Sequence, residues 1–126
     1  MEPVADSYVA ASDSSLVTKA VLRAADRLNV TNKVLARIIG VSEATVSRMK
    51  KGDYPLQAGT KPFELAVLFV RLYRSLDTVV GGDETVAGAW LSNPNVALND
   101  TPLELIQSVS GLTDVIRYLD SRRAVV

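Results

Sequence analysis

The chain has 126 residues, 48% of them hydrophobic, and its 14 basic and 14 acidic residues leave no net charge. That length accommodates one compact domain or two small helical units that share a core, and the hydrophobic content excludes global disorder. Because the chain has no Cys and no His, it excludes disulfides, thiolate and imidazole metal sites and the commonest nucleophilic and acid–base side chains, and we expect neither metal nor cofactor.

We expect no signal peptide in the first residues. Glu2 and Asp6 stand where a signal peptide would have Lys or Arg, and no apolar segment follows them. No run of about 18 apolar residues occurs, so we expect no membrane span and a cytoplasmic protein. Residues 1–14 show no helical periodicity, which predicts a mobile tail.

Apolar residues recur at helical spacing from Leu16 to Leu28, which predicts the first helix. Thr31 or Asn32 can cap a second helix, and Gly40 allows the tight turn that follows it. Ser42 can cap a third helix that ends at residue 52. Residues 31–52 therefore predict a helix-turn-helix, the motif that lays its second helix in the DNA major groove.

The side chains of this motif suit both the packing of its two helices and contact with DNA. Ala36 lets the two helices pack closely, and Val41 and Val46 anchor the second helix to the core. Arg can pair with guanine, Glu can accept from cytosine, and Ala or Thr can touch a thymine methyl, while helix-terminal amides reach phosphates. The residues predicted to contact DNA are Asn32, Ser42, Glu43, Ala44, Thr45, Ser47, Arg48, Lys50 and Lys51.

Charge is distributed unevenly along the chain. Residues 16–52 contain eight basic and two acidic residues, a net charge of +6, so the remainder carries −6. A basic unit joined to an acidic one indicates two partners, a polyanion for the first and a different molecule for the second.

The second half predicts further helices. A loop over residues 53–62 precedes a long helix over 62–79, which is apolar on several sides, and one of those sides is expected to meet a second subunit. Asp83 can cap a helix that follows Gly81 and Gly82. Thr101 resembles the start of a capping box for a helix ended by Gly111, and a last amphipathic helix follows.

No segment shows the period-two alternation of strands, so we predict an all-α fold with about seven helices. It consists of an N-terminal Cro/repressor-like helix-turn-helix unit followed by a small helical unit that binds a partner. The predicted divisions are a tail at 1–14, the helix-turn-helix unit at 15–60 and the helical unit at 61–126.

Three short motifs in the second half resemble a known family: Trp90-Leu91, Pro94-Asn95 and Thr101-Pro102-Leu103-Glu104. Together with the helix-turn-helix they make residues 16–120 similar to the Xre/ParS-type antitoxins that are paired with RES-domain toxins. The resemblance implies a homodimer, formed through the helical core, whose N-terminal unit binds the promoter of its own operon. It also implies that the C-terminal unit masks the active site of a toxin that is similar to ADP-ribosyltransferases and consumes NAD.

Two features depart from the family pattern. Asn99-Asp100 stand where relatives often have two glycines, and both residue types tolerate turns. The segment after the last helix is short. We expect Trp90 to pack in the core with Leu91. Arg and Tyr are enriched at interface anchors, so the predicted toxin contacts are Arg117, Tyr118, Arg122 and Arg123.

Three other interpretations are compatible with parts of this pattern. The chain could be a plain dimeric helix-turn-helix repressor whose C-terminal unit only dimerises, or the helix pair could serve as a structural or protein-docking element. An enzyme is disfavoured, because no recognisable pair of carboxylates and no Gly-rich phosphate loop after a strand is present. We expect a protein that binds DNA and a toxin and has no enzymatic activity.

Overall fold

The computed structural model of the chain describes the backbone of residues 4–124 and the side chains of residues 13–123. This part of the chain is all helical, as predicted, with seven helices and no strand. None of them combines the length and apolar character needed to cross a membrane. In chain order they are α1 (Val4–Arg27), α2 (Asn32–Ile39), α3 (Glu43–Lys51), α4 (Lys61–Val79), α5 (Glu84–Ser92), α6 (Pro102–Leu105) and α7 (Val109–Ala124).

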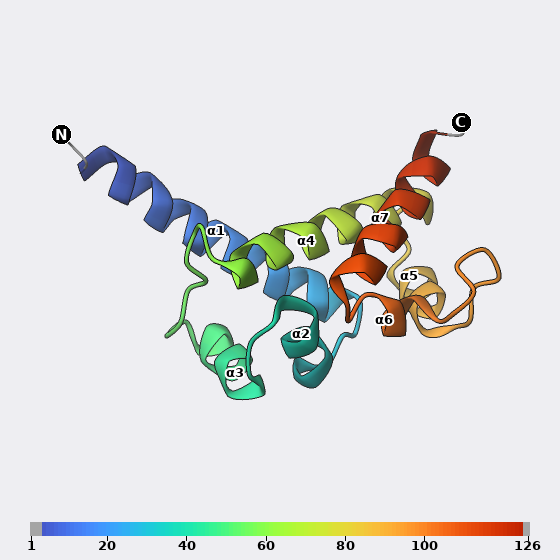
Figure 1. The fold of residues 1–126 in the computed structure, drawn as a ribbon, viewed down its shortest axis with the longest axis horizontal. Helices are drawn as coiled ribbons and strands as arrows, with labels where there is room; N and C mark the ends of the chain where they lie inside the picture. Colours follow the sequence, from blue (N-terminus) through green and yellow to red (C-terminus); the bar gives the residue numbers. More distant parts are fainter. Residues whose placement is uncertain (1–3, 125–126) are drawn as a thin grey trace.

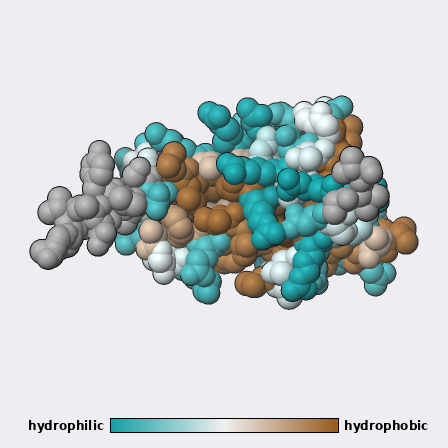
Figure 2. All heavy atoms as spheres, turned by 90° about the horizontal axis from the view of Figure 1, so that it is seen from above, coloured by the Kyte–Doolittle hydropathy of each residue, from teal (hydrophilic) through white to brown (hydrophobic). Residues whose placement is uncertain are grey.

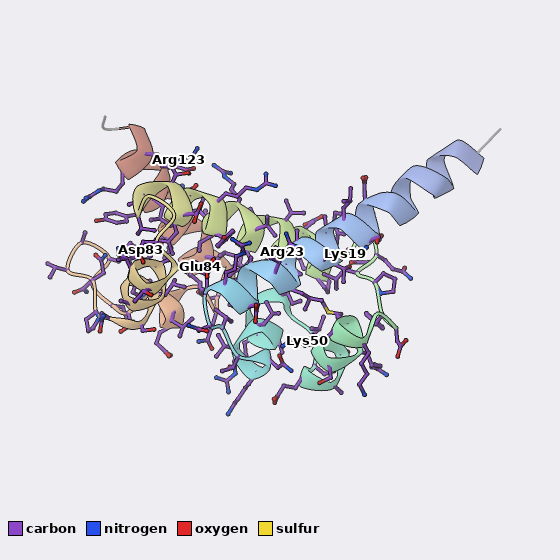
Figure 3. All side chains as sticks on the ribbon, turned by 180° about the vertical axis from the view of Figure 1, so that it is seen from behind. Lys19, Arg23, Lys50, Asp83, Glu84 and Arg123 are labelled. Carbon is purple, nitrogen blue, oxygen red and sulfur yellow. The ribbon has the colours of Figure 1, made fainter. Side chains whose placement is uncertain are left out.

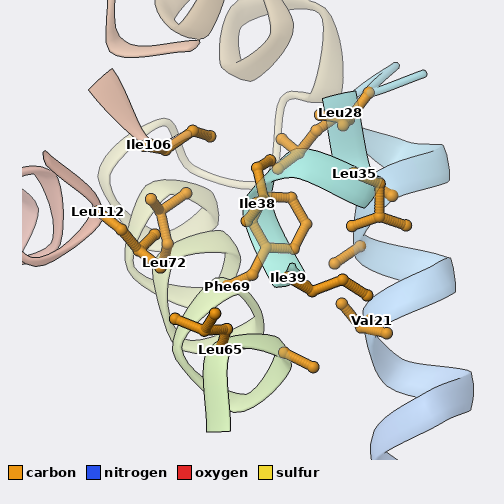
Figure 4. Packing of buried hydrophobic residues seen from close by; sticks show 14 of the residues in the cluster. Val21, Leu28, Leu35, Ile38, Ile39, Leu65, Phe69, Leu72, Ile106 and Leu112 are labelled. Carbon is orange, nitrogen blue, oxygen red and sulfur yellow. The ribbon is translucent and has the colours of Figure 1, made fainter. Parts of the chain in front are cut away.

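Helix α4 occupies the centre of the molecule. It packs against α1 and α2 on one side and against α5 and α7 on the other, so that α2 and α3 lie below it and α5–α7 lie towards one end (Figure 1). Phe69, Leu72 and Leu76 of α4 are completely buried. Among the described side chains, all buried apolar residues form one cluster, in which residues of α1, α2, α4 and α7 meet (Figure 4).

Side-chain caps begin most of the helices. Thr31, Ser42 and Asp83 each accept hydrogen bonds from backbone N–H groups of the following turn, which confirms two predicted caps and selects Thr31 over Asn32. Gly40 has a φ of 75°, as the turn between α2 and α3 requires. Thr101 stands at the start of α6 but makes no side-chain cap bond, so the predicted capping box does not form.

The first helix is longer than predicted. The sequence predicts it from Leu16, but α1 begins at Val4, so residues 4–14 are helical. The segment contains several alanines and no Gly or Pro, and such a sequence can extend an existing helix at little cost. The segment is attached to the loop before α4 at residue 14, because the Ser14 hydroxyl accepts a hydrogen bond from the backbone N–H of Ala58 at 3.2 Å. The mobility of residues 1–14 stays a prediction.

Gly111 does not end a helix, and that prediction was wrong. Helix α6 stops at Leu105, and Gly111 lies inside α7. A Cβ at this position would overlap the backbone carbonyl of Leu105 and crowd the hydroxyl of Ser108. The glycine is therefore required by the close approach of two backbone segments, which a local sequence pattern does not reveal.

A polar network joins α4 to α7. The Ser75 hydroxyl, completely buried, donates to Asp120 Oδ1 at 2.9 Å, and Arg71 Nη2 lies 2.6 Å from Asp120 Oδ2. Arg123 donates to Ser75 Oγ at 3.0 Å. Partial burial acts to raise the pKa of Asp120, but hydrogen bonds from Ser75 and Arg71 outweigh it. Together with the nearby charges of Arg71 and Arg123, they hold the pKa below its ordinary value of 3.8.

We expect Gly111→Ala to lower the free energy of unfolding by about 1–3 kcal/mol, because the added methyl forces α6 and α7 apart. Gly88→Ala is the matched control. Gly88 also lies inside a helix, but a Cβ there would meet open space, so this change should stabilise the protein by about 0.5–1 kcal/mol. Urea denaturation of both variants measures the difference, and a stabilising Gly111→Ala would contradict the packing described.

We expect Asp120→Asn to flatten the dependence of stability on acidic pH. The pKa of Asp120 is lower in the folded than in the unfolded chain. Its contribution to the free energy of unfolding is therefore present above pH 3.8 and is lost as the pH falls through the pKa of the folded chain. The free energy of unfolding, followed from about pH 5 to about pH 2.5, should therefore decrease less in the variant. Asp114→Asn, which removes an exposed pair with Arg117 at 3.8 Å, should keep the wild-type slope.

Candidate DNA-binding and toxin-binding sites

Helices α2 and α3 form the predicted helix-turn-helix. Ala36, Val46 and Met49 are buried, and Val41 packs partly buried against the core, so the inner faces of both helices are fixed. The Ser42 hydroxyl accepts from the N–H of Thr45 at 3.0 Å and starts α3. These contacts hold α3 on the lower side of the molecule, away from α7 (Figure 1).

Most of the predicted DNA contacts line the free face of α3. Seven of them are exposed, and Asn32 is half-buried: the exposed ones are Ser42, Glu43, Ala44, Ser47, Arg48, Lys50 and Lys51. The prediction that Thr45 faces outward was wrong, since it is only 8% exposed. Its hydroxyl lies 2.9 Å from Ser42 Oγ and accepts from Arg48 at 3.4 Å, which makes Thr45 a support for the first turn of α3.

Arg48 is oriented by a residue that sequence reasoning missed. Its guanidinium lies 5.6 Å from the ring centroid of Tyr54, in the loop after α3, as well as within hydrogen-bond distance of Thr45. Tyr54 is 43% exposed. The sequence signal that could have indicated Tyr54 is an aromatic residue directly after a basic helix, because aromatic side chains often accompany Arg at nucleic-acid surfaces. The pair presents a positioned cation beside the outer face of α3.

The basic residues between 16 and 52 are all exposed but do not form one patch. Lys50 lies on α3, whereas Lys19 and Arg23 lie on α1 above it (Figure 3). Arg27 Nη1 contacts Glu84 at 3.2 Å, at the start of α5. The charge available to DNA at α3 is therefore smaller than the +6 of the whole segment suggests.

A groove of about 810 Å³ runs between α1 and α4. Its apolar lining includes Leu16 and Val67, which are 64% and 43% exposed, together with Val17 and Val70. Hydrophobic side chains form a band on this side of the molecule, which faces away from α2 and α3 (Figures 1 and 2). Val67 and Val70 belong to the long helix that the sequence predicts to be apolar on several sides, and its contact with a second subunit stays a prediction.

Aromatic and basic side chains stack where α5 meets α7. The ring centroids of Trp90 and Tyr118 are 6.2 Å apart, and the angle between the two ring planes is 15°. The guanidinium of Arg122 lies 6.0 Å from the Tyr118 ring and donates to its hydroxyl at 3.4 Å. Leu91 is completely buried, but Trp90 is only half-buried, so Trp90 packs against the core rather than within it as predicted.

The four predicted toxin contacts do not form one cluster. Tyr118 and Arg122 stack on α5, while Arg123 donates to Ser75 of α4. Arg117 pairs only loosely with Asp114 and its side chain is 76% exposed. Their spacing on α7 gave no information on this division, because it depends on the neighbours of the helix. Their role in toxin binding stays a prediction.

Two family models match the chain, and between them they cover both sites. The antitoxin Xre-like helix-turn-helix domain matches residues 7–71, and the antitoxin Xre/MbcA/ParS C-terminal toxin-binding domain matches residues 75–124. A search of curated proteins gave no match. The exposed face of α3 lies in the first region, and the stack of Trp90 and Tyr118 lies in the second. The chain thus belongs to the Xre-like antitoxins, with a DNA-binding helix-turn-helix followed by a domain that binds a toxin.

Proposed function

We propose that this antitoxin neutralises a RES-domain toxin that consumes NAD and that it represses its own operon through promoter DNA. The observation that supports this most strongly is the presence of an uncovered recognition helix and a toxin-binding domain in one chain. The motifs around Trp90, Pro94 and Thr101 support the RES class, because they resemble those of antitoxins of that pairing. The protein acts on promoter DNA in the cytoplasm and has no enzymatic activity of its own.

The antitoxin works as a homodimer. The apolar groove between α1 and α4 is the surface available for a second copy, since residues such as Leu16 and Val67 gain nothing from staying in water. Because the groove faces away from α3, a second copy there leaves both recognition helices uncovered (Figures 1 and 2).

We expect Arg48→Ala to relax base preference at one operator position and to weaken specific binding by about 1–3 kcal/mol, because a bidentate contact to guanine is lost. Lys51→Ala should weaken specific and random DNA alike and reduce the salt slope by about one, because it removes a phosphate contact. Fluorescence anisotropy with the operator and with random duplexes measures both effects. Arg117→Ala, in the C-terminal domain, is the control that should bind as the wild type does.

An equal loss on operator and random DNA after Arg48→Ala would contradict the base-reading role. If the wild type itself failed to retain its own promoter fragment, autoregulation would be rejected, while toxin neutralisation would remain open to its own test.

We expect the chain to co-purify with the product of the neighbouring gene, the proposed toxin. In cells that express this toxin, co-expression of the chain should prevent the loss of NAD. A chain ending at Asp120, which lacks Arg122 and Arg123, should neutralise poorly because the stack on Tyr118 and the contact to Ser75 both lose a partner. Cellular NAD and growth are the measurements, and promoter binding by the shortened chain is the control. Full neutralisation by the shortened chain would remove the last turn of α7 from the toxin contact.

A further inference from the structure

The loop between α5 and α6 is closed by hydrogen bonds. Asn95 and Asp100 form an antiparallel bridge, with the N–H of Asn95 donating to the carbonyl of Asp100 at 3.0 Å. The N–H of Asn99 donates to the carbonyls of Asn95 and Val96 at 2.8 and 3.2 Å. The N–H of Leu98 donates to Asn95 Oδ1 at 3.1 Å. These bonds fix the backbone of residues 95–100 within a single small turn.

Both ends of this loop are attached to the body of the protein. Asn93 Nδ2 donates to the carbonyl of Ala89 at the end of α5, at 2.8 Å. Leu98 is half-buried against the core, and Pro102 is buried where α6 begins. Asn99 adopts a φ of 63°, a conformation that Asn tolerates in turns. The departure from the family's two glycines at this point is thus compatible with a closed loop.

Val96 stands inside this loop with 98% of its surface exposed, more than any other large hydrophobic residue among the described side chains. Turn positions of this kind usually hold Gly, Asn, Asp or Ser, and its loop neighbours Asn95, Asn99 and Asp100 follow that rule. A β-branched apolar side chain contributes nothing to the fold at such a site, because it packs against none of the described side chains. The turn would form equally well with a polar residue.

A fixed loop that displays an apolar side chain suits a binding contact. Since the hydrogen bonds already order the backbone, little conformational entropy is lost when a partner covers it. The loop belongs to residues 75–124, the part that matches the toxin-binding domain. It also projects from the end of the molecule opposite α3, where a bound protein leaves the recognition helix free (Figure 1).

We propose that Val96 is an anchor for the toxin and that it inserts into an apolar pocket on the toxin surface. The inference rests on the proposed function, because it takes the toxin as the partner of this domain. It adds a contact that is separate from α7, so the toxin is held at two places: the aromatic stack on Tyr118 and the tip of the 95–100 loop.

Three substitutions in the full-length chain test the anchor, using the purified product of the neighbouring gene as the probe. Burial of one valine side chain is worth about a tenfold change in affinity, so Val96→Asp should weaken toxin binding at least that much. Val96→Ile should retain binding within about threefold, because it stays apolar. Ala97→Asp adds the same charge at the next exposed position and should also change affinity less than threefold.

Calorimetry with the toxin, thermal unfolding and promoter binding are measured on each variant. Because the Val96 side chain is almost fully exposed, its substitution should leave the unfolding temperature and promoter affinity unchanged. Unchanged toxin affinity in Val96→Asp, or equal losses in Val96→Asp and Ala97→Asp, would overturn the proposal. Loss of self-association in Val96→Asp, seen by sedimentation, would also overturn it in favour of a second copy. A wild-type chain that does not bind the toxin at all would instead reject the proposed function.

Discussion

Burial of helix α4 is the interaction on which the rest of the molecule depends. Phe69, Leu72 and Leu76 are completely buried, and α4 contacts helices from both ends of the chain. Truncating one such side chain to Ala typically costs about 2–5 kcal/mol, a large part of the 5–15 kcal/mol that stabilises a small domain. The two matched family domains meet at residues 71–75, inside this helix. The hydrophobic core of each domain therefore includes part of α4.

Features set by local chemistry could be predicted from the sequence. The caps at Ser42 and Asp83 and the turn at Gly40 each depend on a side chain and the few residues next to it, and the structure confirms them. Gly111 was misread for the opposite reason, because its role comes from the approach of the Leu105 carbonyl, which a local pattern does not encode. Thr45 was misread although the spacing was informative: it stands four residues before buried Met49 and so lies on the inner face of α3.

The candidate sites were predictable in outline and less so in detail. The motif predicts which helix faces DNA, because the inward positions are apolar and the outward ones are small, polar or basic. It does not predict Tyr54 beside Arg48, since that contact requires the loop to fold back on α3. The net charge of residues 16–52 overestimates the charge that faces DNA. Arg27 reaches Glu84 of α5, and Lys19 and Arg23 lie on α1, so a segment total counts cations that do not face the recognition helix.

The shared helix also constrains how the two binding functions are arranged. A flexible linker would allow the toxin-binding domain to take many orientations relative to α3, and changes in linker length would be tolerated. Here the junction at residues 71–75 lies within a continuous helix, where one inserted residue turns everything beyond it by about 100°. Such a turn would move Leu76 off the buried face that Leu65 and Phe69 share with it. The packing that stabilises the fold therefore also fixes the direction in which the toxin-binding end points relative to the DNA.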